Sequence, residues 1–505
     1  MAETPKNSET SKRTKSWWSK NWFYITLVLV AVIGGGGAFT LPYYFQHEGD
    51  NIWSLRQAIL AATGGVLAIL TLWENRRKNI QEKEKNDQDH TRQVHAERRS
   101  RYAKAVEQLA DEKAPIRLGG VYTLVKLIDE WLADEKTLPN EEERREEGQV
   151  IVNSLCAYIR SPFDLASRAK VLSQDQTPEN YEGRDQQFTK DPARFREEKE
   201  LRLTILSEIK KRLTGGIRIH KDGAQEILKG LWSDFNYDFS NTVFFYPVSF
   251  SNSYFGASSN FSRVKFTKDA DFIEAEFTRS NFYKVKFTGY ADFTEAKFTQ
   301  SADFYEVKFT GYADFTGAKF TDANFSGAEF TDANFFGVKL TDANFTGAKF
   351  TGNTRFFRAK FTQSANFYEA KFTQSADFTW AEFTDANFTG AKFTGAKFTE
   401  ADFSRVKFTG LAHFSKAEFT GYVDFSKATF EEKPIFEYAL DSKTYKARFS
   451  CKAAPEDYNF KVSYDSPYKI ETEEKEYDEA KFIIPKGTEL FDPDEPSEQN
   501  SDNSS

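Results

Sequence analysis

The chain has 505 residues, a net charge of −8 and 29% charged residues, so it is too long for one ordinary globular core and should contain several modules. Its two cysteines, Cys156 and Cys451, exclude a disulfide framework and fit a reducing compartment. The five histidines show no metal-ligand spacing, so we expect neither a metal site nor a cofactor.

The N-terminal region predicts a membrane hairpin. Residues 22–45 are mostly apolar and long enough to span a bilayer, and residues 57–73 form a second apolar run close to the lower limit for a span. Lys and Arg are frequent in the basic N-terminus (1–21) and after residue 74, whereas the short loop 46–56 carries only Arg56 at its edge. By the positive-inside tendency we expect a multi-pass protein of the cell membrane, with both termini cytoplasmic and the loop extracytoplasmic. A cleaved signal peptide is the alternative for the first segment, although no clear cleavage site is present.

Glycines interrupt both predicted spans, as Gly34–Gly37 in the first and Gly64-Gly65 in the second. Small residues allow close contact between helices in lipid, so the two runs either pack together or are locally flexible with no further role. Neither span contains a buried acid, base or polar ladder, so we interpret the hairpin as an anchor to the lipid bilayer.

The segment after the hairpin predicts helices. Residues 74–110 are mostly charged, without Pro or Gly, and predict a long solvated helix leaving the membrane. Residues 111–230 predict a helical domain with a polar linker. The expected parts are a helix starting near Pro115, helices over 150–159 and 201–213, and a linker over 162–200.

From residue 231 to 436 a phenylalanine recurs every five or six residues, in phrases such as TDANFSGAEF (Thr321–Phe330) and TDANFTGAKF (Thr341–Phe350). A small residue, usually Ala, lies two positions before the Phe, with a polar residue between them. This alternation is strand-like, with the small and large side chains on one face, and the remaining residues suit a turn. A period this short over about 200 residues predicts a solenoid in which each unit buries its Phe against its neighbours.

The pattern A-[DN]-F-[TS]-G resembles the pentapeptide repeat family. The phrases AVEQL (Ala105–Leu109) and RLGGVYTL (Arg117–Leu124) are similar to a helical segment that often precedes the repeats in membrane-anchored bacterial members. The resemblance implies a mostly β fold, a right-handed quadrilateral β-helix with four pentads in each coil. Roughly nine coils would make a rod of ~45 Å at ~4.8 Å per rung. The implied structural core contains Phe315, Phe320, Phe325, Phe330, Phe335, Leu340, Phe345 and Phe350.

Some steps between phenylalanines are six residues long, as from Phe287 to Phe293. We expect each extra residue to bulge outward at a corner of the coil, as in a β-bulge, without breaking the Phe stack. Counting corners modulo four places the extra residues of the first groups at two opposite corners. The same count moves the group at Phe408, Phe419 and Phe430 to the other pair of corners.

The period ends after the rod. Residues 437–485 are expected to cap it, because the ends of a solenoid need covering. Residues 486–505 are acidic and rich in Ser and Asn, and predict a disordered tail.

Three functional classes compete for this architecture. The first is a membrane-tethered, non-catalytic scaffold whose cytoplasmic rod presents a surface to an unknown protein partner, as a monomer or a homo-oligomer. The second follows from the family resemblance: some pentapeptide repeat proteins mimic DNA and bind a type II topoisomerase such as DNA gyrase. A ~45 Å mimic would need on the order of 25 negative charges, whereas acidic and basic residues nearly cancel along the rod. We therefore favour the scaffold and expect no nucleic acid partner.

The third class is an enzyme. A rod filled with phenylalanine offers neither a pocket nor a nucleophile with its base and orienting group, so we expect no catalytic residue. Four tyrosines form a candidate partner patch at outward positions of two adjacent coils, and they either contact a partner or cover neighbouring backbone. They are Tyr283, Tyr290, Tyr305 and Tyr312.

Overall fold

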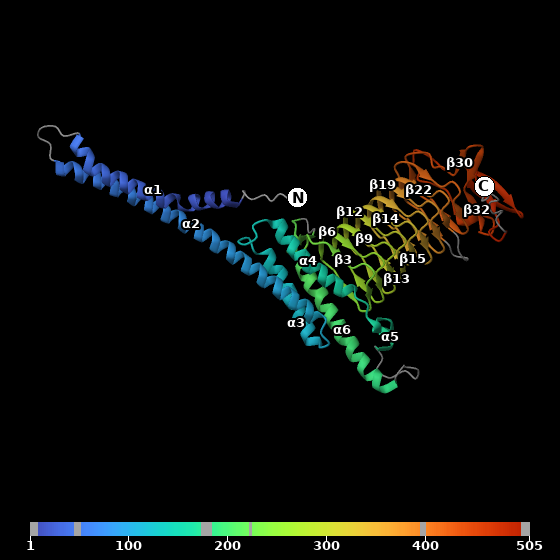
Figure 1. Ribbon diagram of the computed structural model, residues 1–505. Helices are drawn as coiled ribbons and strands as arrows, with labels where there is room; N and C mark the ends of the chain where they lie inside the picture. The colour runs from blue at the N-terminus through green and yellow to red at the C-terminus, as the bar shows by residue number, and fades with distance from the viewer. Residues whose placement is uncertain (1–8, 45–51, 173–183, 222–224, 394–399, 496–505) are drawn as a thin grey trace, which may run out of the picture. The chain divides into compact units, whose positions relative to one another are not determined.

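The structure is a computed structural model that describes residues 9–44, 52–172, 184–221, 225–393 and 400–495 (Figure 1). Its contacts divide the chain into two compact units, residues 1–100 and residues 101–505, and each is described by itself.

The first unit is formed by helix α1 (Glu9–Tyr44) and most of helix α2 (Ile52–Leu109). Both contain a stretch long and apolar enough to cross a membrane. The predicted span 57–73 and the predicted juxtamembrane helix 74–110 are one continuous helix, and this helix begins inside the predicted loop 46–56. No proline lies within α2 to end the backbone hydrogen bonding at residue 73.

The two helices contact each other closely at Gly34. A side chain added at Gly34 would collide with Thr63, whereas Gly64 and Gly65 have open space where a side chain would start. One glycine of the first run therefore packs closely against the second helix, and it contacts a threonine rather than the second glycine run.

The second unit begins with helices that carry their expected start signals. Pro115 lies in the first turn of α3, and the side chain of Asn140 accepts a hydrogen bond from the Glu142 amide at 3.0 Å to cap α4. The helices are α3 (Ala114–Leu132), α4 (Glu141–Arg160), the short 3₁₀ helix η1 (Asp164–Arg168), α5 (Ala169–Leu172) and α6 (Arg184–Leu213).

The polar linker expected over 162–200 is wrong for most of its length, because η1, α5 and the first half of α6 lie within it. Leu165, Leu172 and Phe195 are buried, and these scattered apolar side chains hold the segment against the helical core. An antiparallel hairpin that the sequence did not predict follows α6. It consists of β1 (Thr214–Ile219) and β2 (Gln225–Lys229).

The rest of the second unit is a parallel β-solenoid of about nine turns, the rod seen in Figure 1. Two sheets wrap around it. The larger contains β4 (Val243–Phe244), β5 (Val248–Ser249), β7 (Lys265–Phe266), β8 (Ala270–Asp271), β10 (Lys286–Phe287), β11 (Ala291–Asp292), β13 (Lys308–Asp314), β15 (Glu329–Asn334), β17 (Lys349–Phe350), β18 (Thr354–Arg355), β20 (Lys371–Phe372), β21 (Ala376–Asp377), β23 (Lys392–Phe393), β24 (Glu400–Asp402), β27 (Glu418–Phe419), β28 (Tyr422–Asp424), β32 (Arg448–Ser450), β33 (Tyr458–Asn459) and β36 (Glu489–Phe491). The smaller contains β3 (Tyr237–Asp238), β6 (Tyr254–Asn260), β9 (Glu276–Asn281), β12 (Lys297–Asp303), β14 (Lys319–Asn324), β16 (Lys339–Asn344), β19 (Lys360–Asn366), β22 (Glu382–Asn387), β25 (Lys407–Phe408), β26 (Ala412–His413) and β29 (Thr429–Phe430).

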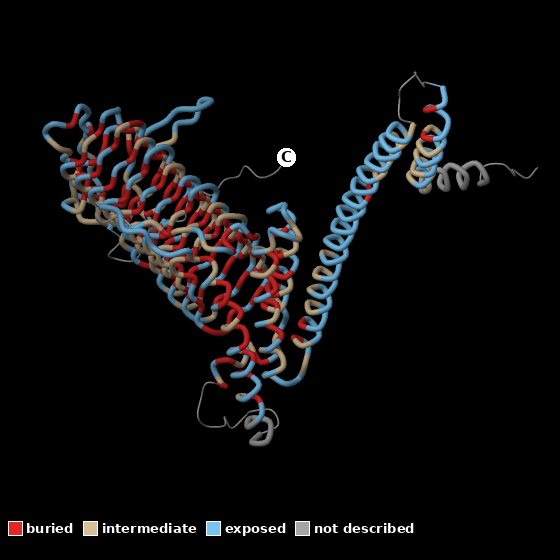
Figure 2. The backbone as a smooth tube through the Cα atoms, turned by 90° about the vertical axis from the view of Figure 1, so that its left-hand side faces the viewer, coloured by how far each residue is buried: buried red, intermediate tan, exposed pale blue. Residues whose placement is uncertain are grey.

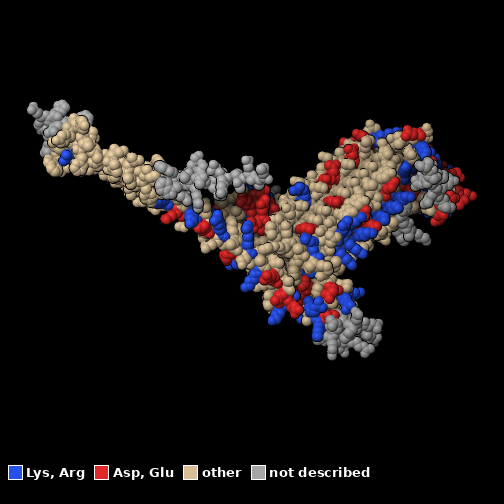
Figure 3. All heavy atoms as spheres, in the orientation of Figure 1, with Lys and Arg blue, Asp and Glu red and all other residues tan. Residues whose placement is uncertain are grey.

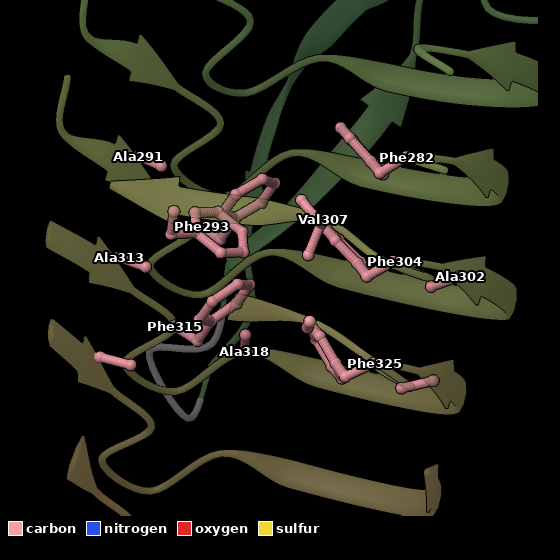
Figure 4. Packing of buried hydrophobic residues seen from close by; sticks show 14 of the residues in the cluster. Phe282, Ala291, Phe293, Ala302, Phe304, Val307, Ala313, Phe315, Ala318 and Phe325 are labelled. Carbon is pink, nitrogen blue, oxygen red and sulfur yellow. The ribbon is translucent and has the colours of Figure 1, made fainter. Parts of the chain in front are cut away.

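The interior of the rod is a set of stacked phenylalanine columns. Parallel pairing in register places Ala291 on Ala313, and the Phe293 and Phe315 rings stack at 5.0 Å with 6° between their planes (Figure 4). All eight residues of the expected structural core are buried, none more than 3% exposed. Figure 2 shows the same regular alternation of buried and exposed positions around every coil.

The six-residue steps are accommodated as expected, by an outward bulge. The pairing register shifts between Phe309 and Tyr312 and between Phe298 and Ser301, while both phenylalanines stay buried in their columns.

The expectation that the later six-residue steps change corners is wrong. Phe403 stacks on Phe378 at 4.9 Å and contacts Phe393 edge-on at 5.8 Å, so Phe393 and Phe403 are neighbours around one coil. The chain uses ten residues for this single step, and part of it, residues 394–399, lies outside the described residues. A count that assigns one corner to every phenylalanine is therefore wrong by one corner from Phe403 onward. The six-residue step after Phe408 lies at the same corner as the earlier step after Phe298.

The coil also continues beyond residue 436. Phe449 stacks on Phe419 at 5.0 Å and Phe460 on Phe425 at 5.9 Å, so the segment expected as a cap adds further rungs. Strand β36 pairs in parallel with β32, which corrects the expectation of disorder for that part of residues 486–505, because Leu490 packs on the core. The remaining elements are the hairpin of β30 (Glu437–Leu440) and β31 (Lys443–Lys446), the short 3₁₀ helix η2 (Pro455–Asp457), and the hairpin of β34 (Thr472–Tyr477) and β35 (Ala480–Pro485).

Candidate interaction surface

Every second corner of the coil is a tight turn. In one example the Val307 amide donates to the Phe304 carbonyl at 3.2 Å, and Glu306 between them has a left-handed backbone with φ 52°. The other corners lie inside the sheets, and all the six-residue steps fall there. The structural unit is therefore a ten-residue pair of unlike pentads, of which TDANFTGAKF (Thr341–Phe350) is one copy.

The polar residue before each phenylalanine depends on the corner that follows. Before a tight turn it is Asp or Asn, because its side-chain oxygen accepts the amide two residues later, as Asp314 does from Thr316 at 2.9 Å and Asn324 from Ser326 at 3.1 Å. Before an in-sheet corner no such bond forms, and the residue is usually Lys or Glu; Arg355 and His413 are among the exceptions to the Asp or Asn position, and Arg448 is one here.

This alternation gives the rod four faces of two kinds, with like faces on opposite sides. The first lysine face contains Lys265, Lys286, Lys308, Glu329, Lys349, Lys371, Lys392, Glu418 and Arg448. The second lysine face contains Glu276, Lys297, Lys319, Lys339, Lys360, Glu382 and Lys407. The aspartate face contains Asp271, Asp292, Asp314, Asn334, Arg355, Asp377, Asp402 and Asp424. The asparagine face contains Asn260, Asn281, Asp303, Asn324, Asn344, Asn366 and Asn387.

Acid–base pairs link successive rungs of the lysine faces without neutralising them. Glu329 pairs with Lys308 at 2.8 Å and with Lys349 at 3.1 Å, and the hydrogen bond from Lys308 is the main reason that the pKa of the Glu329 carboxyl lies below its ordinary value. Among the described residues, Lys286 and Lys371 form no ion pair. Figure 3 shows Lys and Arg side chains gathered in a row along one side of the rod.

The four tyrosines of the candidate patch form two separate stacks. Tyr283 and Tyr305 stack at 5.8 Å beside a tight turn, and Tyr290 and Tyr312 stack at 5.7 Å on the next corner. The first lysine face, with Lys286 and its neighbour on the next rung, lies between the two stacks in chain order, so the tyrosines border that face rather than forming one continuous patch.

The two stacks differ in their surroundings. Tyr290 donates to the Asp314 carboxylate at 3.4 Å, and burial followed by the charges of Asp292 and Asp314 raises the pKa of Tyr290. Tyr283 is half-buried and has the Lys284 ammonium 5.0 Å from its ring. The stack at Tyr290 thus lies toward the aspartate face, whereas the stack at Tyr283 has two cations, Arg263 and Lys284, and the Glu306 carboxylate beside it.

A hairpin insertion interrupts the repeat at one tight turn. The Ala447 amide donates to the Phe436 carbonyl at 2.7 Å, the same bond that closes the ordinary turns, so β30 and β31 replace the two central residues of the turn. A groove of about 640 Å³ separates this hairpin from the first lysine face. Its cations are Lys349, Lys371, Lys392, Lys416, Lys446 and Arg448, against the acids Glu369, Glu418 and Glu489.

A second pocket, of about 420 Å³, lies beside a tight turn on the second lysine face and includes Trp380, Arg405 and Lys427. No pattern in the sequence predicted this pocket. The one feature that could have indicated it is a single Trp at a turn position that holds Gly, Glu, Arg or Lys in the neighbouring repeats. Among the described residues, no group of three His, Cys, Asp or Glu side chains is placed to hold a metal ion.

Comparison with known proteins identifies the repeats. A sequence profile of eight pentapeptide repeats matches residues 313–352 and 374–410, and a second profile of nine copies matches residues 250–297 and 393–439. No curated protein sequence gives a significant match.

One of the matching solved structures is HetL, a pentapeptide repeat protein involved in heterocyst differentiation regulation in the cyanobacterium Nostoc sp.. The match has 20% identity and a TM-score of 0.25, and covers 39% of this chain and 77% of HetL. The matched profiles together span most of the stacked phenylalanine columns, so this part of the chain is built of pentapeptide repeats.

Proposed function

We propose that this protein is a non-catalytic scaffold of the bacterial cell membrane, anchored by two helices, whose rod binds a partner protein in the cytoplasm. The observation that carries the proposal is that the rod's interior is filled with stacked phenylalanine, so that its chemical variety lies on the outer faces. Pentapeptide repeat proteins in general serve structural or interaction roles.

Two apolar stretches support the membrane anchor. Residues Asn21–Tyr44 have a mean hydropathy of 2.0 and the apolar stretch of α2 has 1.6, and hardly any of their residues are buried within the protein. Apolar surface of this length left exposed in water would be strongly unfavourable, and a bilayer is the environment that removes the cost.

The regions bordering the first lysine face support partner binding. Tyr305 and Tyr312 are 37% and 41% exposed, and Lys286, which forms no ion pair among the described residues, lies on the face between the two stacks. Exposed aromatic rings are enriched at protein–protein interfaces, and a lysine without a counter-ion is available to pair with an acidic group of the partner.

The surface charge argues against binding a topoisomerase as a DNA mimic. The aspartate face carries at most one carboxylate per rung, roughly every 4.8 Å, and Asn334 and Arg355 interrupt it. Duplex DNA carries one negative charge per ~1.7 Å. The two lysine faces, which flank the aspartate face, carry positive charge and further reduce the likeness to DNA.

Anchoring and orientation are tested together by cysteine labelling in intact cells. On a Cys451→Ser background, Ser54→Cys should react with a membrane-impermeant maleimide from outside. Lys104→Cys, an exposed residue beyond the second span, should react only after the cells are permeabilised. Extraction of the protein by alkaline carbonate, or the reverse labelling pattern, would contradict the proposed anchor or its orientation.

Partner binding is tested by crosslinked pulldown of the full chain from native membranes. Two paired variants separate the two tyrosine stacks: Tyr283→Ser with Tyr305→Ser, and Tyr290→Ser with Tyr312→Ser. We expect the first pair to reduce recovery of partner more, because the Arg263 and Lys284 cations lie 5.8 Å and 5.0 Å from the centre of the Tyr283 ring, whereas Tyr290 is hydrogen-bonded to the Asp314 carboxylate. Equal recovery from both variants and from the unmodified chain would exclude the tyrosines as contacts, and recovery of gyrase subunits would restore the DNA-mimic function.

A further inference from the structure

In a repeat protein, features that recur in every coil serve the fold, so a position that departs from its equivalents is where a specific function is expected. The left-handed position of the tight turns between the aspartate face and the second lysine face holds Gly317 and Gly337 in successive coils, then Arg358, Trp380 and Arg405. Trp380 has φ 61°, close to the 58° of Arg358 and the 59° of Arg405, so the left-handed backbone recurs and the indole side chain is what departs from the repeat.

The fold does not bury this side chain, since 47% of Trp380 is exposed. The rung hydrogen bond is also long here: the Trp380 amide lies 3.3 Å from the Ser404 carbonyl, against 3.0 Å for the equivalent bond of Arg358 and 2.8 Å for that of Arg405. A large aromatic side chain that the repeat does not require and the fold does not bury points to a role outside the fold.

Cations outnumber acids around the exposed ring: three basic side chains line its pocket with one acid, Glu382, which is paired with Lys360 at 3.0 Å. The Arg405 guanidinium lies 4.9 Å from the centre of the Trp380 ring, and Lys427 occupies the same position one rung further along. Within the described part of the chain neither Arg405 nor Lys427 forms an ion pair, whereas Lys407 in the same pocket is paired with Glu431 at 3.0 Å. The pocket of about 420 Å³ therefore offers one flat apolar surface beside two cations without counter-ions.

We propose that the Trp380 pocket is a recognition site of the rod for an acidic segment of a partner protein, on the side opposite the first lysine face. An apolar or aromatic side chain of the segment lies on the exposed part of the Trp380 ring, and flanking carboxylates pair with Arg405 and Lys427. Tryptophan and arginine are the residues most enriched among those that dominate binding energy at interfaces. This inference rests on the proposed scaffold function and names the kind of partner segment the rod binds.

The pocket is tested with the full chain in lipid nanodiscs and a phage-displayed library of random dodecapeptides. Panning should enrich peptides in which acidic residues flank an aromatic or large apolar residue. A labelled synthetic copy of an enriched peptide, measured by fluorescence anisotropy, should bind Trp380→Gly at least about tenfold more weakly, and Arg405→Gln should also weaken it. Arg358→Gly is the matched control, because it removes a side chain from the equivalent position of the preceding coil, and it should leave the affinity within about twofold.

The glycine variant separates binding from folding. Because glycine adopts the left-handed conformation without strain, Trp380→Gly should melt at the same temperature as the unmodified chain or higher. Failure to enrich acidic peptides, or equal affinity of the enriched peptide for Trp380→Gly, would overturn the proposal. Quenching of tryptophan fluorescence by adenosine monophosphate that disappears in Trp380→Gly, without peptide enrichment, would overturn it in favour of a nucleotide.

Failure of this site is distinguishable from failure of the scaffold function. If crosslinked partners are recovered equally from membranes with Trp380→Gly and with the unmodified chain, the scaffold function stands and the pocket is excluded. If no partner is recovered from either and no acidic peptide is enriched, both proposals fall.

Discussion

The indole nitrogen of Trp232 donates a hydrogen bond to Asp129 at 2.8 Å, joining the last residues before the rod to helix α3. The same carboxylate accepts from Arg212 of α6 at 2.8 and 2.9 Å, and the Arg212 guanidinium lies 4.9 Å from the centre of the Trp232 ring. One carboxylate thus connects two helices and the first coil. This connection is expected to make the helical domain a cap on the N-terminal end of the rod.

Replacing Asp129 by alanine should destabilise the second unit by about 2 kcal/mol, because the Trp232 N–H and part of the Arg212 guanidinium lose their partner. Trp232→Phe should cost less, about 1 kcal/mol for a single hydrogen bond. Urea unfolding followed by circular dichroism measures both. Glu135→Ala, an exposed residue after α3, is the control and should have little effect. Equal stability of Asp129→Ala and the control would show that the connection does not contribute.

Phe315→Ala should destabilise the rod by about 3–5 kcal/mol, since it leaves a cavity between the rings of Phe293 and Phe335, which stack on it at 5.0 and 4.8 Å. Because each coil contacts only its neighbours, hydrogen exchange should rise most in β13 and β15. Phe336→Ala removes a ring that is 38% exposed and should cost far less. A loss spread evenly along the rod would contradict the nearest-neighbour description.

Thr354→Ala should leave the rod's stability unchanged or raise it by about 1 kcal/mol. Thr354 occupies an inward position that is Ala333 and Ala376 on the adjacent rungs, and its hydroxyl is buried without a hydrogen-bond partner among the described residues. Removing the hydroxyl relieves the cost of burying it. A lower melting temperature for the variant would mean instead that packing of the threonine methyl group outweighs that cost.

Glu329→Gln should reduce the loss of rod stability on acidification. The pKa of Glu329 is lowered in the folded state by Lys308 and Lys349, so its ionised form adds stability above the unfolded pKa, and this contribution disappears as the pH falls through the folded pKa. Comparing melting temperatures at pH 6 and pH 3 tests this. The effect should be small because the pair is partly exposed, and an identical pH dependence in the variant would contradict it.

Local patterns in the sequence were enough to predict the stacked phenylalanine columns, the bulged six-residue steps and the two apolar helices. Each depends on residues only a few positions apart, such as the alanine two places before each Phe, and these short spacings determine which side chains share a face. The apolar length that spans a bilayer is likewise a local property.

The position of a residue around the coil could not be predicted in this way, because it depends on how many residues each coil uses. The ten-residue step from Phe393 to Phe403 shifts every later residue by one corner relative to a simple count. For the same reason, three features appear only in the folded chain. They are the spacing of the two tyrosine stacks, the groove beside the hairpin that replaces a turn after Phe436, and the pocket of Trp380 and Arg405. These sites join residues from successive coils. Contacts between coils depend on where the chain returns after each full turn of the β-helix, and the five-residue period alone does not determine this.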